Sequence, residues 1–191
     1  MKRQLSFRQY RSIDLTLFAV ILCVSEWLLV TSATRWFPDQ LYTVSLVSAL
    51  TAIVMMRWGP WAAIHAFLGG AVFCLASHGS GRQFLIYAVG NVLSMLMLIP
   101  LRRLGGERIR NDSFLSVCFG LGTLLLMQLG RALLAMLTGA EFQSALGFFT
   151  TDTLSLLFTG LILWVARRAD GIFEDQKHYL LRIHKEEKGG F

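Results

Sequence analysis

The chain has 191 residues, of which 54% are hydrophobic and 16% are charged, and its mean hydropathy is +0.55. A soluble domain carries about 25% charged residues, so this composition argues against a soluble protein and predicts an integral membrane protein. The net charge of +6 is also found in nucleic-acid-binding proteins, but the distribution of Lys and Arg along the chain argues against that class.

Six apolar stretches follow one another along the chain, and none alternates with the period of two that marks a β-strand. They are Leu15–Ala33, Leu41–Met56, Trp61–Ser77, Phe84–Leu101, Phe114–Leu137 and Leu146–Ala166. The first is too long for the apolar core of a signal peptide, so we expect it to remain as a span. Helices are the usual spanning structure. The predicted fold is therefore all-α, with six transmembrane helices in one bundle over residues 14–168.

Lys and Arg are distributed unevenly between the connections. With six spans, fifteen of the 18 Lys and Arg residues lie on the side of the two termini, Arg35 and Arg82 lie on the other, and Arg131 lies within a span. Cytoplasmic connections carry the excess of Lys and Arg. We therefore expect both tails, residues 1–13 and 169–191, to be cytoplasmic, in a bacterial cell membrane.

The fifth stretch contains a charge at membrane depth. Arg131 lies within the otherwise largely apolar run Ser113–Leu137. A guanidinium near the middle of a bilayer costs at least about 2.5–3.5 kcal/mol, so it normally faces the bundle interior and a partner or ligand. With a rise of about 1.5 Å per residue, several other polar groups should lie in the same outer half. These are Glu26, Tyr87, Asn91, Gln128 and Asp152.

Two interpretations of this polar group remain open. In one, Arg131 pairs with Asp152 or Glu26 only to fix the packing of the helices. In the other, Arg131 binds the carboxylate or phosphate of a small substrate through paired hydrogen bonds. The two acids would then orient it or the ligand, while Asn91, Gln128 and Tyr87 would add hydrogen bonds. Trp27, Trp36 and Phe37 are candidates for an aromatic wall, with an interfacial position as the alternative for Trp36.

Small residues repeat every four positions on two of the predicted helices. Ala19 and Cys23 do so on the first, and Ala62 and Ala66 on the third. Such ridges let helices approach closely. They fit packing within the bundle, or a face for another membrane subunit.

The C-terminal segment Asp170–Lys188 is charged but periodic. Ile172, Phe173, Tyr179, Leu180 and Ile183 can share one helical face. We expect a helix on the membrane surface or against a partner, or else a solvated tail.

Catalytic signatures are missing from the sequence. It has no HExxH, no GxSxG, no glycine-rich phosphate loop and no cluster of metal ligands. We therefore expect no enzyme activity, no metal and no cofactor in this chain. An intramembrane enzyme using Glu26 and Asp152 is a further alternative, but the different depths of these two residues argue against a catalytic pair.

The chain resembles the substrate-binding S component of an energy-coupling factor (ECF) transporter. The run RWGPWAAIHAFLGGAVF is similar to the family's passage from second to third helix, and QFLIYAVGNVLSMLMLIPLRRLGGERI to its fourth helix and basic exit. The resemblance implies capture of a small, vitamin-like nutrient in a pocket open to the outside. It also implies a transmembrane coupling subunit, docked on the first helix, and two cytoplasmic ATPases that use ATP. The family often has Ala-x-x-x-Ala at that docking site, and Cys23 departs from this pattern.

A structural scaffold is the alternative from another class. Rod-shape-determining proteins of the MreD type are similar in size and helix number, and Pro38–Leu41 resembles their early loop. The chain lacks the acidic residue expected in their glycine-rich middle helix. A scaffold of this kind is expected to have no pocket for a small molecule.

Overall fold

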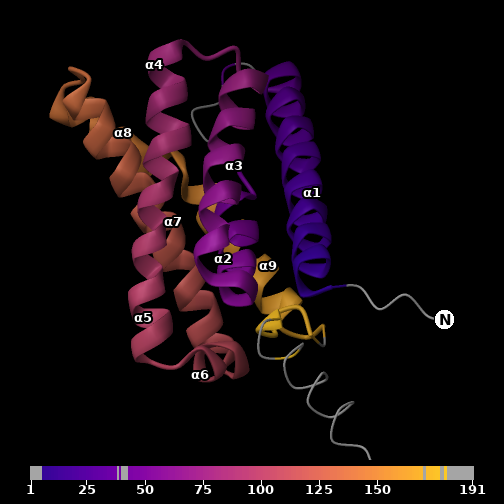
Figure 1. Ribbon diagram of the computed structural model, residues 1–191. Helices are drawn as coiled ribbons and strands as arrows, with labels where there is room; N and C mark the ends of the chain where they lie inside the picture. Colours follow the sequence, from indigo (N-terminus) through magenta and orange to yellow (C-terminus); the bar gives the residue numbers. More distant parts are fainter. Residues whose placement is uncertain (1–5, 38, 40–42, 170, 177–178, 180–191) are drawn as a thin grey trace, which may run out of the picture.

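Helices account for all the regular structure in the computed structural model, which describes residues 6–37, 39, 43–169, 171–176 and 179 (Figure 1). Short 3₁₀ or π-helical turns, labelled η, connect some of the α-helices. The elements are α1 (Phe7–Trp36), α2 (Val47–Trp58), η1 (Gly59–Trp61), α3 (Ala62–Ala76), α4 (Gly81–Phe84), η2 (Leu85–Val89), η3 (Asn91–Met97), α5 (Leu98–Arg103), α6 (Gly106–Asn111), α7 (Ser113–Leu137), α8 (Phe142–Thr151) and α9 (Thr153–Ala166).

The helices run up and down between two ends of one bundle. We call the end where α1 begins and α9 finishes the terminal end, and the opposite end, with α4 and α8, the far end (Figure 1). The beginning and end of the described chain meet, since Tyr10 Oη donates a hydrogen bond of 3.1 Å to Gln176 Oε1. The two described ends therefore share one side of the bundle.

Five helical stretches among the described residues are long and apolar enough to cross a membrane, and Val47–Ala76, which contains α2 and α3, is one of them. Its two helices lie antiparallel, because a Cβ atom added at Gly69 would come within 2.4 Å of the Val47 side chain. The chain reverses between them at Gly59, whose φ of +59° favours glycine. Pro60 follows at the first turn of η1.

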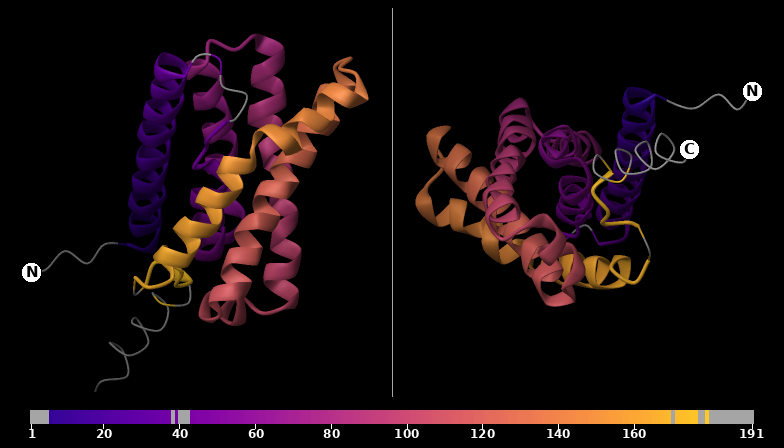
Figure 2. Two further views of the ribbon diagram at one scale, coloured as in Figure 1. Left: turned by 180° about the vertical axis from the view of Figure 1, so that it is seen from behind. Right: turned by 60° about the horizontal axis from the view of Figure 1, so that its bottom comes forward.

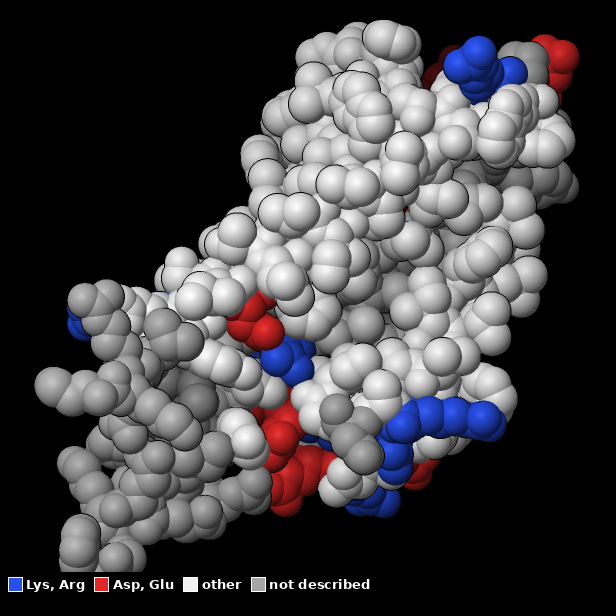
Figure 3. Space-filling view, turned by 90° about the vertical axis from the view of Figure 1, so that its right-hand side faces the viewer, with Lys and Arg blue, Asp and Glu red and all other residues white. Residues whose placement is uncertain are grey.

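Apolar side chains remain exposed around the middle of the bundle. Leu17, Val24 and Leu28 on α1 are each more than half exposed, as are Leu157 and Leu161 on α9. In Figure 3, charged side chains gather toward the lower, terminal end and at one place at the upper end, with an uncharged band between them. Such a band fits contact with lipid chains and would be unusual on a soluble protein.

Helix α7 is the centre of the bundle. It packs against η2, η3, α2, α8 and α9. The main core cluster includes Met55 and Met56 of α2, Phe119 of α7 and Leu163 of α9. By contrast, α1 packs chiefly against α3 and less against α2. In Figure 2, α8 and α9 cross the other helices obliquely, and α8 diverges from the bundle at the far end.

Several boundaries differ from the sequence prediction. Helix α1 begins at Phe7, inside the expected tail, because Ser6 and Gln9 form a capping box. Helix α2 begins at Val47, six residues after the predicted start at Leu41. The last predicted span is interrupted at Asp152, between α8 and α9. Most of the loop Pro38–Leu41, which resembles the MreD type, lies outside the described residues.

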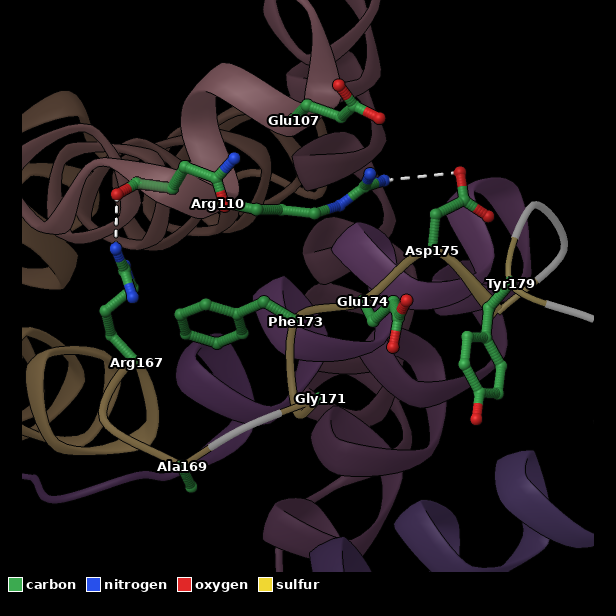
Figure 4. A pocket seen from close by; sticks show the side chains of 10 residues that line it. Glu107, Arg110, Arg167, Ala169, Gly171, Phe173, Glu174, Asp175 and Tyr179 are labelled. Atoms are coloured by element: carbon green, nitrogen blue, oxygen red, sulfur yellow. Dashed lines mark hydrogen bonds and ion pairs between the residues drawn. The ribbon is translucent and has the colours of Figure 1, made fainter. Parts of the chain in front are cut away.

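The first residues of the C-terminal segment pack onto the terminal end of the bundle. Phe173 is 6% exposed and belongs to the main core cluster. Arg57 Nη1 donates hydrogen bonds of 2.9 Å to the carbonyl oxygens of Gly171 and Ile172. Arg110 of α6 forms an ion pair with Asp175, as Figure 4 shows. Leu180 and Ile183, predicted to continue this face, lie outside the described residues.

Candidate functional site

An ion pair between Arg131 and Asp152 lies inside the bundle, toward the far end. Arg131 Nη1 is 2.7 Å from Asp152 Oδ2, and Arg131 Nε donates a hydrogen bond of 2.8 Å to Asn91 Oδ1. Arg131 is 5% exposed, Asp152 3% and Asn91 0%. The guanidinium carbon lies 4.9 Å from the centre of the Tyr87 ring. Four of the predicted residues therefore come together from α7, the α8–α9 joint, η3 and η2.

Close backbone contacts fix the position of Arg131 relative to Asn91. A Cβ atom added at Gly130 would lie 2.1 Å from the carbonyl oxygen of Gly90, and one added at Gly90 would lie 2.8 Å from the Arg131 nitrogen. Only glycine at both positions allows this approach. The neighbouring segment is irregular, because the chain passes through the π-helical turn η2 into the 3₁₀ turn η3. A π-helical turn within a helix often marks a functional site.

A non-helical segment, residues 43–46, enters the bundle beside the ion pair. The Thr43 hydroxyl donates a hydrogen bond to Asp152 Oδ1. The Ser45 backbone nitrogen donates one of 3.0 Å to the Ser155 hydroxyl. The Leu46 nitrogen donates one of 3.0 Å to Glu26 Oε2. Non-helical backbone at membrane depth is tolerated only where protein or a water-filled cavity surrounds it.

Glu26 lies close to the ion pair but is not part of it. It is 0% exposed, and its carboxylate is close enough to Arg131 and Asp152 to interact with their charges. Its Oε1 atom is buried and has no hydrogen-bond partner in the described chain. Gln128, one turn before Arg131 on α7, is 2% exposed, and among the described residues no hydrogen bond joins its side chain to the cluster. The sequence predicts that both residues contact Arg131 or its ligand.

The aromatic side chains at the site are not the three that the sequence suggested. Trp27, Trp36 and Phe37 are 47%, 71% and 61% exposed, so they lie on the surface rather than around Arg131. Instead, Tyr87 is flanked by two phenylalanines. Its ring centre is 4.6 Å from that of Phe73, in a stacked arrangement, and 5.7 Å from that of Phe148, in an edge contact.

Sequence reasoning missed Thr43, Ser155, Phe73 and Phe148. The first two are hydroxyls that the sequence does not distinguish from those that bond within their own helix. The phenylalanines are apolar residues in apolar runs and carry no separate signal. Their contacts depend on the tertiary arrangement of α3, η2 and α8.

The proposed docking residues fall into two groups. Ala62 and Ala66 of α3 are 0% exposed, so packing within the bundle, the first of the two interpretations, describes them. In this arrangement they offer no surface to a partner, which corrects that part of the prediction. Ala19 and Cys23 of α1 are partly exposed, and the sequence prediction for them stays open.

Four hollows of the described chain lie away from Arg131. The largest, about 660 Å³, is at the terminal end between α6 and the C-terminal segment (Figure 4). Another, about 380 Å³, lies at the far end and includes Ile86, Ala135 and Phe148. Phe148 thus lines this outer hollow and also contacts the Tyr87 ring. Within the described ranges, no three His, Cys, Asp or Glu side chains are grouped to hold a metal ion.

The chain was also compared with known proteins. No protein-family model, no curated protein and no solved structure matches it. The interpretation therefore depends on the geometry of the site itself.

Proposed function

We propose that this protein spans the membrane six times, with both termini in the cytoplasm, and captures a small anionic or zwitterionic solute from outside. The distribution of arginines supports the orientation. Nine arginines in the described residues lie at the terminal end, against Arg35 and Arg82 at the far end. The positive side of a membrane protein faces the cytoplasm, so the far end, with Arg131 beneath it, would face outward.

A comparison of two buried arginines carries the proposal. Arg57 and Arg131 are 8% and 5% exposed, and each pairs with one aspartate. Arg57 uses all three nitrogens, because Nε and Nη2 bind Asp14 at 3.0 and 2.8 Å and Nη1 binds two carbonyl oxygens. Among the described residues, Arg131 hydrogen-bonds through Nε and Nη1, and its Nη2 group is not one of the fully buried side-chain atoms that lack a partner.

This difference separates a structural arginine from one that can bind a ligand. A guanidinium has five N–H donors in a rigid fork, and Arg131 engages fewer of them with protein groups than Arg57 does. Arg57 shows how this chain satisfies an arginine that only holds helices together. The Nη2 group of Arg131 remains available to a carboxylate or phosphate, which would approach it edge-on and accept two hydrogen bonds.

Glu26 and segment 43–46 support a zwitterionic solute. The Oε1 atom of Glu26 is buried without a partner, and a buried unsatisfied oxygen calls for an explanation. An ammonium or amide group of the solute would provide its donor. The non-helical segment 43–46 connects Glu26 with Asp152. Broken backbone of this kind lines the substrate sites of many membrane transporters.

The role within a transport system follows the resemblance to ECF S components. Capture alone does not move a solute, so a transmembrane coupling subunit and two ATPases would supply the energy. The exposed apolar face of α1 around Val20 and Val24 is the proposed contact for the coupling subunit, with Ala19 and Cys23 at its edge.

Two matched variants test the site. Native mass spectrometry of the purified protein, released gently from detergent, should show a small co-purifying molecule. Arg131→Lys keeps the charge but loses the planar fork, so this molecule should be lost. Arg57→Lys makes the same change in the other buried ion pair and should keep the molecule. If the purified protein carries no molecule, carboxylated vitamins and amino acids should each be tested for a thermal shift.

The proposal is refuted if Arg131→Lys retains the molecule as wild type does, or if no compound binds at all. A second function has one observation in its favour, because none of the four hollows is lined by Arg131. A sealed ion pair suits a scaffold of the MreD type. Pull-downs that yield cell-wall proteins and no ATPase would favour that function.

A further inference from the structure

A hollow of about 430 Å³ opens at the terminal end, away from the Arg131 site. It lies between the start of α1, the α2–η1–α3 corner, the end of α5 and helix α6. Four arginines line it, namely Arg11, Arg57, Arg102 and Arg110, together with one carboxylate, Asp175. The positive charges therefore outnumber the negative charge in its wall.

Two of these arginines are already occupied within the protein. Arg57 is neutralised by Asp14, and Arg110 binds the Met56 carbonyl oxygen and Asp175. Arg11 and Arg102 form no ion pair with a carboxylate in the described chain. The wall thus retains two guanidinium charges that internal carboxylates do not offset.

Aromatic side chains hold one of these charges in place. The Arg11 guanidinium lies 4.4 Å from the centre of the Trp61 ring and 5.9 Å from that of Phe7. Such stacking limits the motion of an arginine and leaves its N–H groups free to bind an anion. Trp61 is 42% exposed, as is usual for tryptophan at the level of lipid headgroups.

The apolar surface beside the hollow continues along α3. Trp61 is followed at intervals of three residues by Ile64 and Phe67, which are 48% and 38% exposed. Residues three apart lie on neighbouring positions of one helix face. A ligand with a charged head in the hollow could therefore lay a hydrocarbon chain along this face.

We propose that this hollow binds the phosphate group of an anionic phospholipid. The phosphate would lie between Arg11 and Arg102, which supply charge-assisted hydrogen bonds. The acyl chains would follow α3 into the membrane. Basic pockets between transmembrane helices on the cytoplasmic side are known sites for anionic headgroups. The site is independent of solute capture, but its place on the cytoplasmic side rests on the orientation proposed above.

The experiment compares two double variants in detergent by native mass spectrometry, with dioleoyl phosphatidylglycerol and dioleoyl phosphatidylcholine as probes. Arg11→Gln with Arg102→Gln removes the two charges of the hollow. Arg8→Gln with Arg103→Gln removes the same charge from exposed positions of the same helices, α1 and α5, that do not line the hollow. Wild type and control should retain phosphatidylglycerol in preference to phosphatidylcholine, and the hollow variant should retain at least about tenfold less of it.

Several results would overturn the proposal. Equal losses of bound phosphatidylglycerol in the two double variants would mean that the lipid is attracted to the basic end in general. Equal retention of the two lipids would mean that the site does not distinguish their headgroups. Displacement of the lipid by millimolar inorganic phosphate or glycerol phosphate would assign the site to a soluble phosphate compound. If the hollow variant does not fold, lipid retention is measured in the single variant Arg102→Gln. Arg102 is exposed, so this substitution should not disturb the fold. Unchanged lipid retention in that variant would equally overturn the proposal.

Discussion

Substitution of Gly130 by alanine tests whether close packing of α7 against the Gly90 segment positions Arg131. The new Cβ atom would lie 2.1 Å from the Gly90 carbonyl oxygen, whereas ordinary contact begins at 3.4 Å, so the two backbones must separate by about 1.3 Å. Backbone atoms cannot rotate aside as a side chain does. The hydrogen bond of 2.8 Å between Arg131 Nε and Asn91 Oδ1 would then break.

The expected cost has two parts. Overpacking of a core typically costs about 1–3 kcal/mol, and loss of a hydrogen bond to a charged group about 1.5–3 kcal/mol. We therefore expect Gly130→Ala to lower the free energy of unfolding by about 2.5–6 kcal/mol. Gly160→Ala on α9 is the matched control, since its Cβ atom would meet only Val117 Cγ1, at 3.7 Å. Alanine there should be neutral or stabilising by up to about 1 kcal/mol.

Equilibrium unfolding in mixed micelles with increasing sodium dodecyl sulfate, followed by tryptophan fluorescence, measures both variants. If Gly130→Ala unfolds within about 1 kcal/mol of Gly160→Ala, the helices do not approach as closely as described. The argument that glycine contacts set the position of Arg131 would then be wrong.

Three further substitutions probe other parts of the bundle. Asp152→Asn should lower the free energy of unfolding by about 3–5 kcal/mol, since it leaves the buried Arg131 charge unpaired; a loss under about 1 kcal/mol in the same titration would show that the pair contributes little. Gly59→Ala has space but needs a φ of +59° with a ψ of −120°, so we expect a loss of about 1–3 kcal/mol, and an unchanged thermal midpoint would contradict this. Arg57→Lys should speed chymotrypsin cleavage after Phe173, because two hydrogen bonds to the neighbouring carbonyl groups are lost; an unchanged cleavage rate would mean that Arg57 does not anchor this segment.

The helical class of the fold could be predicted because hydrophobicity along the chain marks each helix directly. The grouping of Arg131, Asp152 and Asn91 could be anticipated for a related reason. A charge at membrane depth must face the interior, and the rise per residue places the three at similar heights. These inferences use only one dimension, depth along the helix axis.

The direction in which each side chain points around the helix axis, toward lipid or toward the bundle, could not be predicted in the same way. Trp27 and Phe73 are both aromatic residues in apolar runs, yet one is exposed and the other stacks on Tyr87. The interruption of the last helix at Asp152 has no glycine or proline to signal it. Ala62 and Ala66 form the same kind of small-residue ridge whether the neighbour is α1 or another protein.

The contacts of residues 171–176 constrain the order in which the bundle can be completed. The hydrogen bond between Tyr10 and Gln176 joins positions 166 residues apart, and those from Arg57 join positions 114 and 115 apart. During synthesis, α1 and α2 therefore enter the membrane long before their partners at the terminal end exist. Until then the Arg57–Asp14 pair must hold this end with two of its four hydrogen bonds still missing. Residues 171–176 complete the terminal end last, so a chain truncated before Gly171 would keep helices α1 to α9 but leave the terminal end open.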